Sequence, residues 1–239
     1  MCIMNEIIRD SFQLCFPFWK TLQPEQELYL LNQTKILRLL KGTSIYNGDE
    51  TCNGIFLIKK GAIRVYILSE DGRDITLYRL SAGEVDLLSC DSVLTKITFD
   101  VNIEVEVDAE LFLIPISPYI QINNKNLHVS LYTYQLSATR FSDIMWTLQE
   151  ILFLSFDRRL AGFFLRESER VGSNRLFLTH DQIAKYVGSA REVVSRMCKY
   201  FVKEGIISTE RGEINILDKQ RLIAIAGSDN KTADSASRR

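Results

Sequence analysis

Long apolar runs are missing from this chain of 239 residues. No stretch approaches the roughly 18 to 20 consecutive apolar residues that a helix needs to cross a bilayer. The first residues, 1–6, also lack the basic start, long apolar core and small-residue cleavage site of a signal peptide. We therefore expect a cytoplasmic protein with no membrane partner.

Cysteines are few and widely spaced, at positions 2, 15, 52, 90 and 198. None forms a Cys-x-x-Cys pair, which argues against a structural zinc site, and an odd count in a cytoplasmic chain indicates reduced thiols. The first four could converge on an iron–sulfur cluster, but the ligand spacing typical of such clusters is absent. Buried or inert thiols are the favoured interpretation, so we expect no metal and no cofactor.

Histidine is scarcer still, with only His128 and His180 in the whole chain. A metal-dependent enzyme built on a β-barrel usually needs two histidines and a carboxylate that converge inside the barrel. No histidine precedes residue 128, where such a barrel would lie. A haem sensor would need His or Cys as axial ligand, and Cys90 is the one conceivable candidate. We predict that the protein is not an enzyme.

Charge is divided unevenly along the chain. Residues 1–125 carry 12 Lys and Arg against 17 Asp and Glu, whereas residues 157–221 carry 13 against 9. An acidic half joined to a basic half indicates that only the C-terminal part meets phosphate. Its excess of positive charge is modest, so we expect binding to depend on a dimer that places two such parts on one duplex.

The most informative segment is residues 178–212, which predicts two short helices at a sharp corner. Thr179 with Gln182, and Ser189 with Glu192, both fit the capping box that opens a helix. Gly188 between them lacks a Cβ and tolerates positive φ. In the second helix, the residues that follow helical spacing and should face inward are Val194, Met197, Cys198 and Phe201. The segment is thus typical of a helix-turn-helix.

A hairpin follows, in which residues 206–208 and 213–216 flank Arg211-Gly212 and make the winged variety of this motif. The run Arg191-Glu192-Val193-Val194-Ser195-Arg196 resembles the second helix of Crp/Fnr bacterial transcription regulators. The resemblance implies that Arg191 and Arg196 contact guanines, which fits arginine chemistry, and that Glu192 accepts from cytosine. Ser195 would contact a base or a phosphate. Glu192 has a second interpretation, as the cap partner of Ser189. Phosphate contacts are expected from Thr179, Ser189, Lys199 and Arg211.

The N-terminal half predicts an antiparallel β-roll or jelly roll. After a helix near Glu25–Leu31, apolar runs are separated by turn signals such as Lys60-Gly61 and Ala82-Gly83. In the last strand Ile103, Val105 and Val107 alternate with acidic residues, which indicates one wet face. The glycine pattern resembles the cyclic-nucleotide-binding fold of Crp/Fnr proteins, so the resemblance covers roughly residues 15–225.

The effector is where this chain departs from its relatives. Crp/Fnr members that bind cyclic nucleotide use a Gly-Glu turn and then an Arg-Ser or Arg-Thr pair that clamps the phosphate. This chain keeps Gly83-Glu84 but has no arginine between Arg79 and Arg140, and acidic residues surround the turn. We expect an unidentified small effector, or none, and not cyclic AMP. Arg140 either meets Glu84 or is solvated. The pocket candidates are Gly83, Glu84, Leu88, Ser89, Cys90 and Arg140.

A long helix should join the two halves, because residues 126–154 contain neither glycine nor proline. Apolar side chains recur there at alternating spacings of four and three, the a/d pattern of a two-stranded coiled coil. A single helix packed on its own sheet is the alternative interpretation. The predicted dimer seam consists of Leu127, Leu131, Tyr134, Ala138, Phe141, Met145, Leu148 and Leu152. A change of helix direction near residues 155–157 would form a hinge.

Together these features predict an α+β protein of four parts: a sensor β-roll at 1–125, a dimerisation helix and hinge at 126–156, a winged helix-turn-helix at 157–226, and a disordered tail at 227–239. We expect a homodimeric DNA-binding transcription regulator that reads an inverted repeat and, if it activates, contacts RNA polymerase. The alternative is a ligand sensor that acts through a protein partner.

Overall fold

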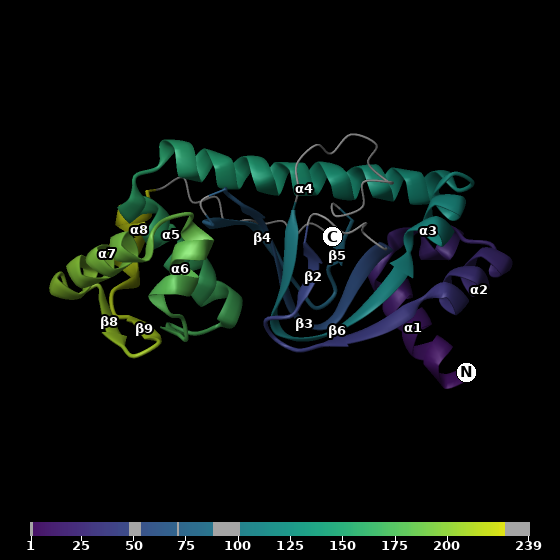
Figure 1. The fold of residues 1–239 in the computed structure, drawn as a ribbon, viewed down its shortest axis with the longest axis horizontal. Coiled ribbons are helices and arrows are strands. Elements are labelled where there is room, and N and C mark those ends of the chain that lie inside the picture. The colour runs from purple at the N-terminus through teal and green to yellow at the C-terminus, as the bar shows by residue number, and fades with distance from the viewer. Residues whose placement is uncertain (1, 48–53, 71, 88–100, 228–239) are drawn as a thin grey trace. The chain divides into compact units, whose positions relative to one another are not determined.

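The computed structural model describes residues 2–47, 54–70, 72–87 and 101–227 (Figure 1). In chain order its elements are α1 (Cys2–Cys15), the 3-10 helix η1 (Pro17–Thr21), α2 (Pro24–Gln33), β1 (Lys35–Leu39), β2 (Ser44–Asn47), β3 (Gly54–Leu68), β4 (Asp74–Ser81), β5 (Val85–Asp86), β6 (Asn102–Pro115), α3 (Ile116–Asn123), α4 (Leu127–Phe153), α5 (Phe156–Val171), β7 (Arg175–Leu176), α6 (His180–Val187), α7 (Arg191–Lys203), β8 (Ile207–Glu210), β9 (Glu213–Ile216) and α8 (Lys219–Ala226). The expected tail from residue 228 onward lies outside the described residues.

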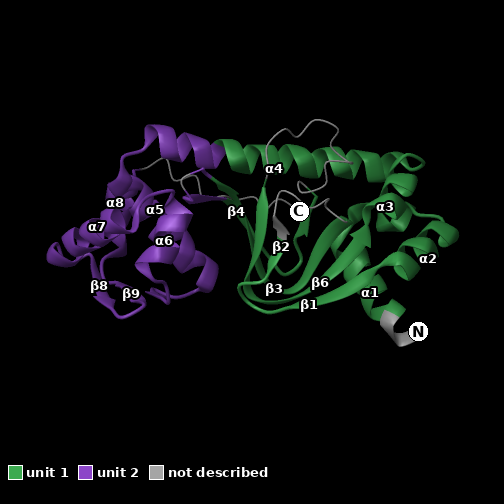
Figure 2. Cartoon of the chain, viewed as in Figure 1, with its two compact units in different colours: residues 1–68, 77–145 green, residues 69–76, 146–239 purple. Residues whose placement is uncertain are grey.

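Two compact units make up the chain, and Figure 2 gives them different colours. The N-terminal unit comprises residues 1–68 and 77–145, and the C-terminal unit comprises residues 69–76 and 146–239. Helix α4 runs through the division, so its C-terminal end, from Trp146 onward, belongs to the C-terminal unit. Each unit has its own apolar core.

One six-stranded sheet forms the predicted roll, with strand order β1-β6-β3-β4, and with β2 paired to β6 and β5 to β3. The pairings of β6 with β1, β2 and β3 are antiparallel, as expected from the turn signals. Strand β6 alternates as predicted at its start, where Ile103 and Val105 are fully buried. The α+β architecture with an antiparallel roll is therefore confirmed.

Two details of the roll differ from the prediction. Lys60-Gly61 is not a turn, because β3 continues through it as one strand of 15 residues. The register against β6 shifts around Lys60 and Ala62, and this bulge reorients the facing side chains. Val107, expected to face inward, is consequently 55% exposed. A bulge adds a residue to one strand, so a strict two-residue period cannot follow it.

Gly61, in this bulge, is expected to be sensitive to substitution by any residue with a Cβ. Its φ is +91°, and a Cβ there would lie 2.4 Å from the Asp108 carbonyl oxygen. Gly61→Ala should therefore lower the free energy of unfolding by more than about 2 kcal/mol, since the left-handed conformation alone costs roughly 1–2 kcal/mol. Gly42→Ala is the matched control, because Gly42 has φ +83° but nothing within 4 Å of its Cβ position. Denaturant titration followed by the fluorescence of buried Trp19 measures both, and equal losses would contradict the prediction.

Helices close one side of the roll around an aromatic cluster. Phe12 of α1 meets Phe16 and Trp19 edge-on, at ring-centroid distances of 5.1 and 5.0 Å. Tyr132 of α4 packs edge-on against Phe16 and Phe18. Helix α2 confirms the helix expected near Glu25–Leu31, whereas α1 was not predicted. Its sequence signal is the apolar pair Ile8 and Phe12, four residues apart and both buried.

Helix α4 confirms the long helix expected after the roll. On its inner face Val129, Thr133 and Arg140 are buried. On its outer face all eight predicted seam residues are exposed in the protomer, and the seven large ones range from Leu148 at 36% to Leu127 at 81%. This row of exposed apolar side chains has no cover within the described chain. No helix among the described residues is long and apolar enough to span a membrane.

The C-terminal unit is built on α5. Leu160 and Phe164 of that helix are fully buried, together with Ile183 of α6 and Val194 and Phe201 of α7. Tyr186 of α6 stacks on Phe163 with ring centroids 5.5 Å apart. Helices α6 and α7 are therefore held by one core, with β8 and β9 as the predicted hairpin and β7 as an additional strand beside β9.

Candidate nucleic-acid interface

Helix α6 opens with the capping box that the sequence predicts. Thr179 accepts the Gln182 backbone N–H at 3.2 Å, and the Gln182 side chain accepts the Thr179 N–H at 2.9 Å. The helix ends at Gly188, which has φ +60° and ψ +56° and donates its N–H to the Ala184 carbonyl. Left-handed backbone of this kind suits glycine and turns the chain sharply into α7.

The second predicted capping box is wrong. The N-cap of α7 is Ala190, and no side chain caps this helix end. Ser189 lies one residue too early, in the turn, where its backbone N–H donates to the Ala184 carbonyl at 3.0 Å. Glu192 in the first helical turn is exposed and does not reach back to Ser189 as a cap partner. The cap interpretation of Glu192 is thereby removed, which leaves its carboxylate available on the surface.

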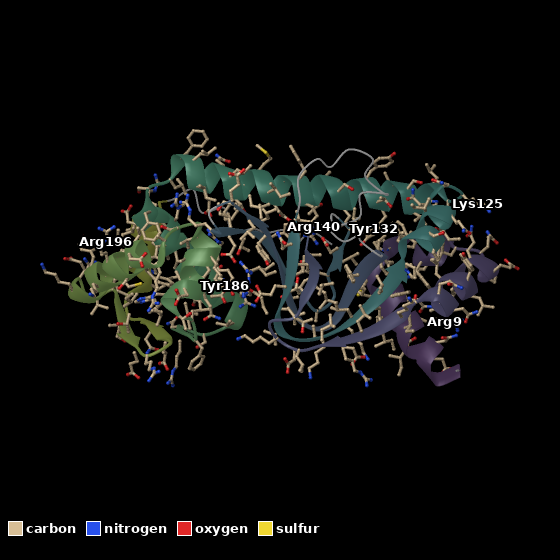
Figure 3. The ribbon with its side chains drawn as sticks, in the orientation of Figure 1. Arg9, Lys125, Tyr132, Arg140, Tyr186 and Arg196 are labelled. Atoms are coloured by element: carbon tan, nitrogen blue, oxygen red, sulfur yellow. The ribbon has the colours of Figure 1, made fainter. Side chains whose placement is uncertain are left out.

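Helix α7 has one buried and one exposed face, as predicted. Val194, Cys198 and Phe201 are at most 1% exposed, and Met197 packs against the same core. On the other face Arg191, Glu192 and Arg196 are exposed and Ser195 is half-buried. Figure 3 labels Arg196 on this helix. The rigid inner face fixes the outer side chains as a row that can enter the major groove of a duplex.

Asp181 is a neighbour of this row that sequence reasoning missed. Its carboxylate lies 3.5 Å from the guanidinium of Arg191, and both side chains are more than half exposed. Exposed ion pairs of this kind contribute about 0–1 kcal/mol, so Arg191 can leave Asp181 at small cost. Arg196 has no such carboxylate among the described ion pairs. The two arginines therefore differ in that Arg191 is ion-paired and Arg196 has no described ion pair.

The wing carries Arg211 at its tip, exposed beside Gly212 with φ +76°. The first residue of β9 after this turn, Glu213, is held by Arg175 of β7, whose guanidinium donates to both of its carboxylate oxygens at 2.5 and 2.7 Å. This pair lowers the pKa of Glu213. Arg175 was not predicted to have a role, and its contacts make it a support of the wing. Thr179 and Lys199 are exposed, and Ser189 is half-buried.

Among the described residues, no group of three His, Cys, Asp or Glu side chains could hold a metal ion. Cys198 is buried in the core of the C-terminal unit, and this burial raises the pKa of its thiol to about 12. A thiol with that pKa is protonated at neutral pH and is a poor nucleophile. Its position supports the inert interpretation for this cysteine.

In the N-terminal unit, Arg140, one of the predicted pocket candidates, lies on α4 on the side of the roll (Figure 3). Of the two alternatives left open by the sequence, solvation of Arg140 is wrong, because the side chain is buried. Burial raises the pKa of Glu84, and Arg140 lies close enough for its charge to oppose that rise, without an ion pair or hydrogen bond between them among the described contacts. The Arg140 guanidinium donates to the Val85 carbonyl at 2.9 Å and to Asp143 at 3.0 Å. Glu84 accepts instead from the Ser81 backbone N–H at 2.8 Å. Three further pocket candidates, Leu88, Ser89 and Cys90, lie outside the described residues.

A buried hydroxyl and carboxylate lie beside Arg140. The Tyr78 hydroxyl donates to Asp86 at 2.9 Å, and the Tyr78 ring lies 5.1 Å from the Arg140 guanidinium carbon. Burial, together with the charge of Asp86, raises the pKa of Tyr78 well above its ordinary value. Neither Tyr78 nor Asp86 was a predicted site residue. The signal for them is weak, because an isolated tyrosine and aspartate in strands have no diagnostic spacing.

Comparison with known proteins supports both units. Residues 36–126 match the cyclic nucleotide-binding domain and residues 158–225 match the Crp-like helix-turn-helix domain. The chain is 29% identical over 235 residues to the anaerobic regulatory protein of Haemophilus influenzae, which covers 92% of this chain and 86% of that protein. It is 28% identical to the fumarate and nitrate reduction regulatory protein of Vibrio cholerae, over 90% of this chain and 87% of that one.

Among solved structures, a Crp/Fnr-family transcriptional regulator from Eubacterium rectale is 43% identical, with a TM-score of 0.84. The match covers 88% of this chain and 98% of that one. Such identity over nearly the whole of a relative exceeds a likeness of fold alone, and it agrees with the helix-turn-helix and the roll described above. The chain belongs to the Crp/Fnr family of transcription regulators.

Proposed function

We propose that this regulator binds DNA as a homodimer, with the α7 helix of each protomer in the major groove at one half-site of an inverted repeat. The observation that carries this proposal is the row of exposed Arg191, Glu192 and Arg196 and half-buried Ser195 on a helix whose other face is fixed in a core. Half-site centres would lie one helical turn apart, roughly 34–36 Å. The regulator would act in the cytoplasm and, as an activator, would also contact RNA polymerase.

The roles of the side chains follow from their chemistry. Arg191 and Arg196 would each donate two hydrogen bonds to a guanine, and Glu192 would accept from the amino group of a cytosine. Ser195 would contact a base or a phosphate. The backbone phosphates would be met by Thr179 and Ser189 near the helix corner, by Lys199 on α7 and by Arg211 on the wing.

The dimer would form along α4. Seven large apolar residues and Ala138 line the outer face of this helix, and all are exposed in the protomer. Exposed apolar patches that continue along a heptad pattern are typical of helix–helix interfaces. A two-stranded coiled coil with a second copy of α4 covers them and ties the two reading helices to one axis.

The proposed function is tested by selecting bound duplexes from a random pool and then measuring affinity over a salt series. We expect an inverted repeat to be enriched. Lys199 and Arg211 give four cationic phosphate contacts per dimer, which predicts a slope of about −4 in log affinity against log salt concentration. Enrichment of no common sequence, with a slope near zero, would contradict the proposal. That outcome would favour the alternative in which the C-terminal unit contacts a protein.

Cyclic AMP is expected not to bind. The arginine that clamps the cyclic phosphate in nucleotide-binding relatives is absent between Arg79 and Arg140. Arg140 itself is already engaged by Asp143 and the Val85 carbonyl. Isothermal titration of the full-length protein with cyclic AMP should show no heat of binding at concentrations where a micromolar affinity saturates the site. A micromolar dissociation constant would contradict this prediction.

A further inference from the structure

The connection between α4 and α5 is short and is held from both sides. Helix α4 ends at Phe153 and α5 begins at Phe156, with Ser155 in extended conformation between them. Ser155 makes no side-chain cap on α5. The sequence predicted a hinge at this break. The contacts around it, all within the C-terminal unit, oppose free bending.

Arg166 of α5 binds two side chains near the C-terminal end of α4. Its guanidinium donates to the two carboxylate oxygens of Glu150 at 2.9 and 3.1 Å, and lies 4.5 Å from the ring centroid of Trp146. The Arg166 and Glu150 side chains are 28% and 16% exposed. A planar guanidinium can bind a carboxylate with two bonds while stacking on an aromatic ring, which an ammonium group cannot do.

Arg159, in the first turns of α5, completes the connection. It donates to the Ile151 carbonyl at 2.8 Å, one of the last carbonyls of α4. The final carbonyls of a helix have no partner within the helix and carry partial negative charge, so a guanidinium there is favourable. Its guanidinium carbon also lies 5.6 Å from the Phe156 ring, on the first residue of α5.

The contacts of Arg166 oppose bending because Arg166 lies far along α5 from the break between the two helices. Arg166 follows the first residue of α5 by ten positions, which places it about 15 Å along the helix from the break. At that distance a small change in the angle between the helices moves the guanidinium away from Glu150 and Trp146. The angle between α4 and α5 therefore cannot change without breaking both contacts of Arg166.

This arrangement also reaches the DNA-reading helix. Leu160 and Phe164 of α5 share one core with α6 and α7, so α7 follows the direction of α5. We propose that Arg166 and Glu150 are positioning residues which fix the angle between α4 and α5. In a dimer joined along α4, that angle sets the distance between the two α7 helices. It thereby sets the half-site spacing that the protein accepts. The proposal rests on the proposed function and adds a determinant of operator spacing to it.

The test uses the full-length protein and synthetic inverted repeats whose central spacer is shortened or lengthened by one or two base pairs. The natural protein should prefer one spacing by about tenfold or more, since each added base pair both shifts and rotates a half-site. Arg166→Gln and Glu150→Gln should each reduce this preference to about threefold or less. Arg166→Lys keeps the positive charge without the two-bond geometry. Its spacing preference should be intermediate between that of the two glutamine variants and that of the natural protein.

Two features separate positioning from a general loss of structure. The double variant Glu150→Gln/Arg166→Gln should resemble either single variant, because one removed partner already ends the interaction. Arg170→Gln is the matched control, since Arg170 pairs with Glu167 within α5 and does not touch α4 among the described contacts. It should keep the natural spacing preference. Thermal unfolding of each variant verifies that the protein is folded.

A second measurement needs no DNA. Trp19 is buried and Trp146 is 41% exposed, so acrylamide quenching of tryptophan fluorescence reports mainly on Trp146. Arg166→Gln removes the cover from that ring and should increase quenching, whereas Arg170→Gln should not. Unchanged quenching, or an affinity loss that is equal at every spacing, overturns the proposal. If the natural protein binds no inverted repeat at all, the proposed function fails. The quenching measurement still tests the contacts of Arg166 with Glu150 and Trp146 in that case, and unchanged quenching in Arg166→Gln would show that they do not hold the two helices together.

Discussion

Arg196→Ala is expected to weaken operator binding by about 2–6 kcal/mol for the dimer, that is, 1–3 kcal/mol at each half-site. This corresponds to a loss in affinity of roughly 30-fold to more than 10⁴-fold. Arg196 is exposed in the middle of α7, opposite the buried Val194 and Cys198. A two-bond contact with guanine is lost in each protomer, while the core of the C-terminal unit is untouched. Competition binding against duplexes substituted at each position measures the effect.

The pattern of the loss matters as much as its size. Arg196→Ala should flatten the preference at one base position, whereas Arg211→Ala should weaken all duplexes alike and reduce the salt slope by about 1 per contact removed. Arg191→Ala should have a smaller effect than Arg196→Ala, because Arg191 gives up its ion pair with Asp181 on binding. Full discrimination retained by Arg196→Ala would show that this side chain does not read a base.

Phe141→Glu is expected to abolish the dimer at micromolar concentrations. Phe141 is 64% exposed in the protomer, so its replacement leaves the fold intact. In the proposed seam it would be buried against the second copy, where each lost phenyl ring removes about 1.5–3 kcal/mol. Two opposed carboxylates in an apolar seam add several kcal/mol more. The dimer dissociation constant should rise by more than about 10⁴-fold. Sedimentation equilibrium measures it, and operator affinity should fall in parallel.

The matched control for the seam is Thr139→Glu. Thr139 is exposed and lies two residues before Phe141 on α4, outside the predicted seam. Its hydroxyl donates to the Gln135 carbonyl at 3.0 Å, a local contact within the helix. The same negative charge placed there should leave the protein dimeric. A dimer retained by Phe141→Glu, or one lost equally in Thr139→Glu, would place the interface elsewhere.

Much of the reading head could be predicted from local chemistry. The Thr179 cap, the left-handed Gly188 and the inward face of α7 each depend on residues within one or two helical turns, so their spacing shows in the sequence. The cap at Ser189 failed for a reason of the same scale. In the turn after α6, the Ser189 backbone N–H donates to the Ala184 carbonyl. The N-cap of α7 is therefore Ala190, one residue later than predicted.

Contacts between distant residues could not be predicted in this way. The bulge at Gly61 depends on its facing strand, and it moved Val107 to the outside although the alternation argued otherwise. Arg140 was expected at Glu84 or in solvent; it is buried near Glu84, but α4 brings its guanidinium to the Val85 carbonyl and not to the Glu84 carboxylate. The grip of Arg166 on Glu150 joins residues 16 apart across a helix break. No periodic pattern encodes such a pair.

The sequence by itself therefore determined the roll, the long helix after it, the two helices of the reading head with their hairpin, and which face of α7 is exposed, because hydrophobic period and capping are local properties. Only the tertiary structure decided where the long arginines go. Their guanidinium groups reach several ångströms beyond the backbone and can bind any carbonyl, carboxylate or ring that folding brings near. In this chain, folding places Arg166 on Glu150 and Arg159 on the Ile151 carbonyl across the break where the sequence predicted a hinge.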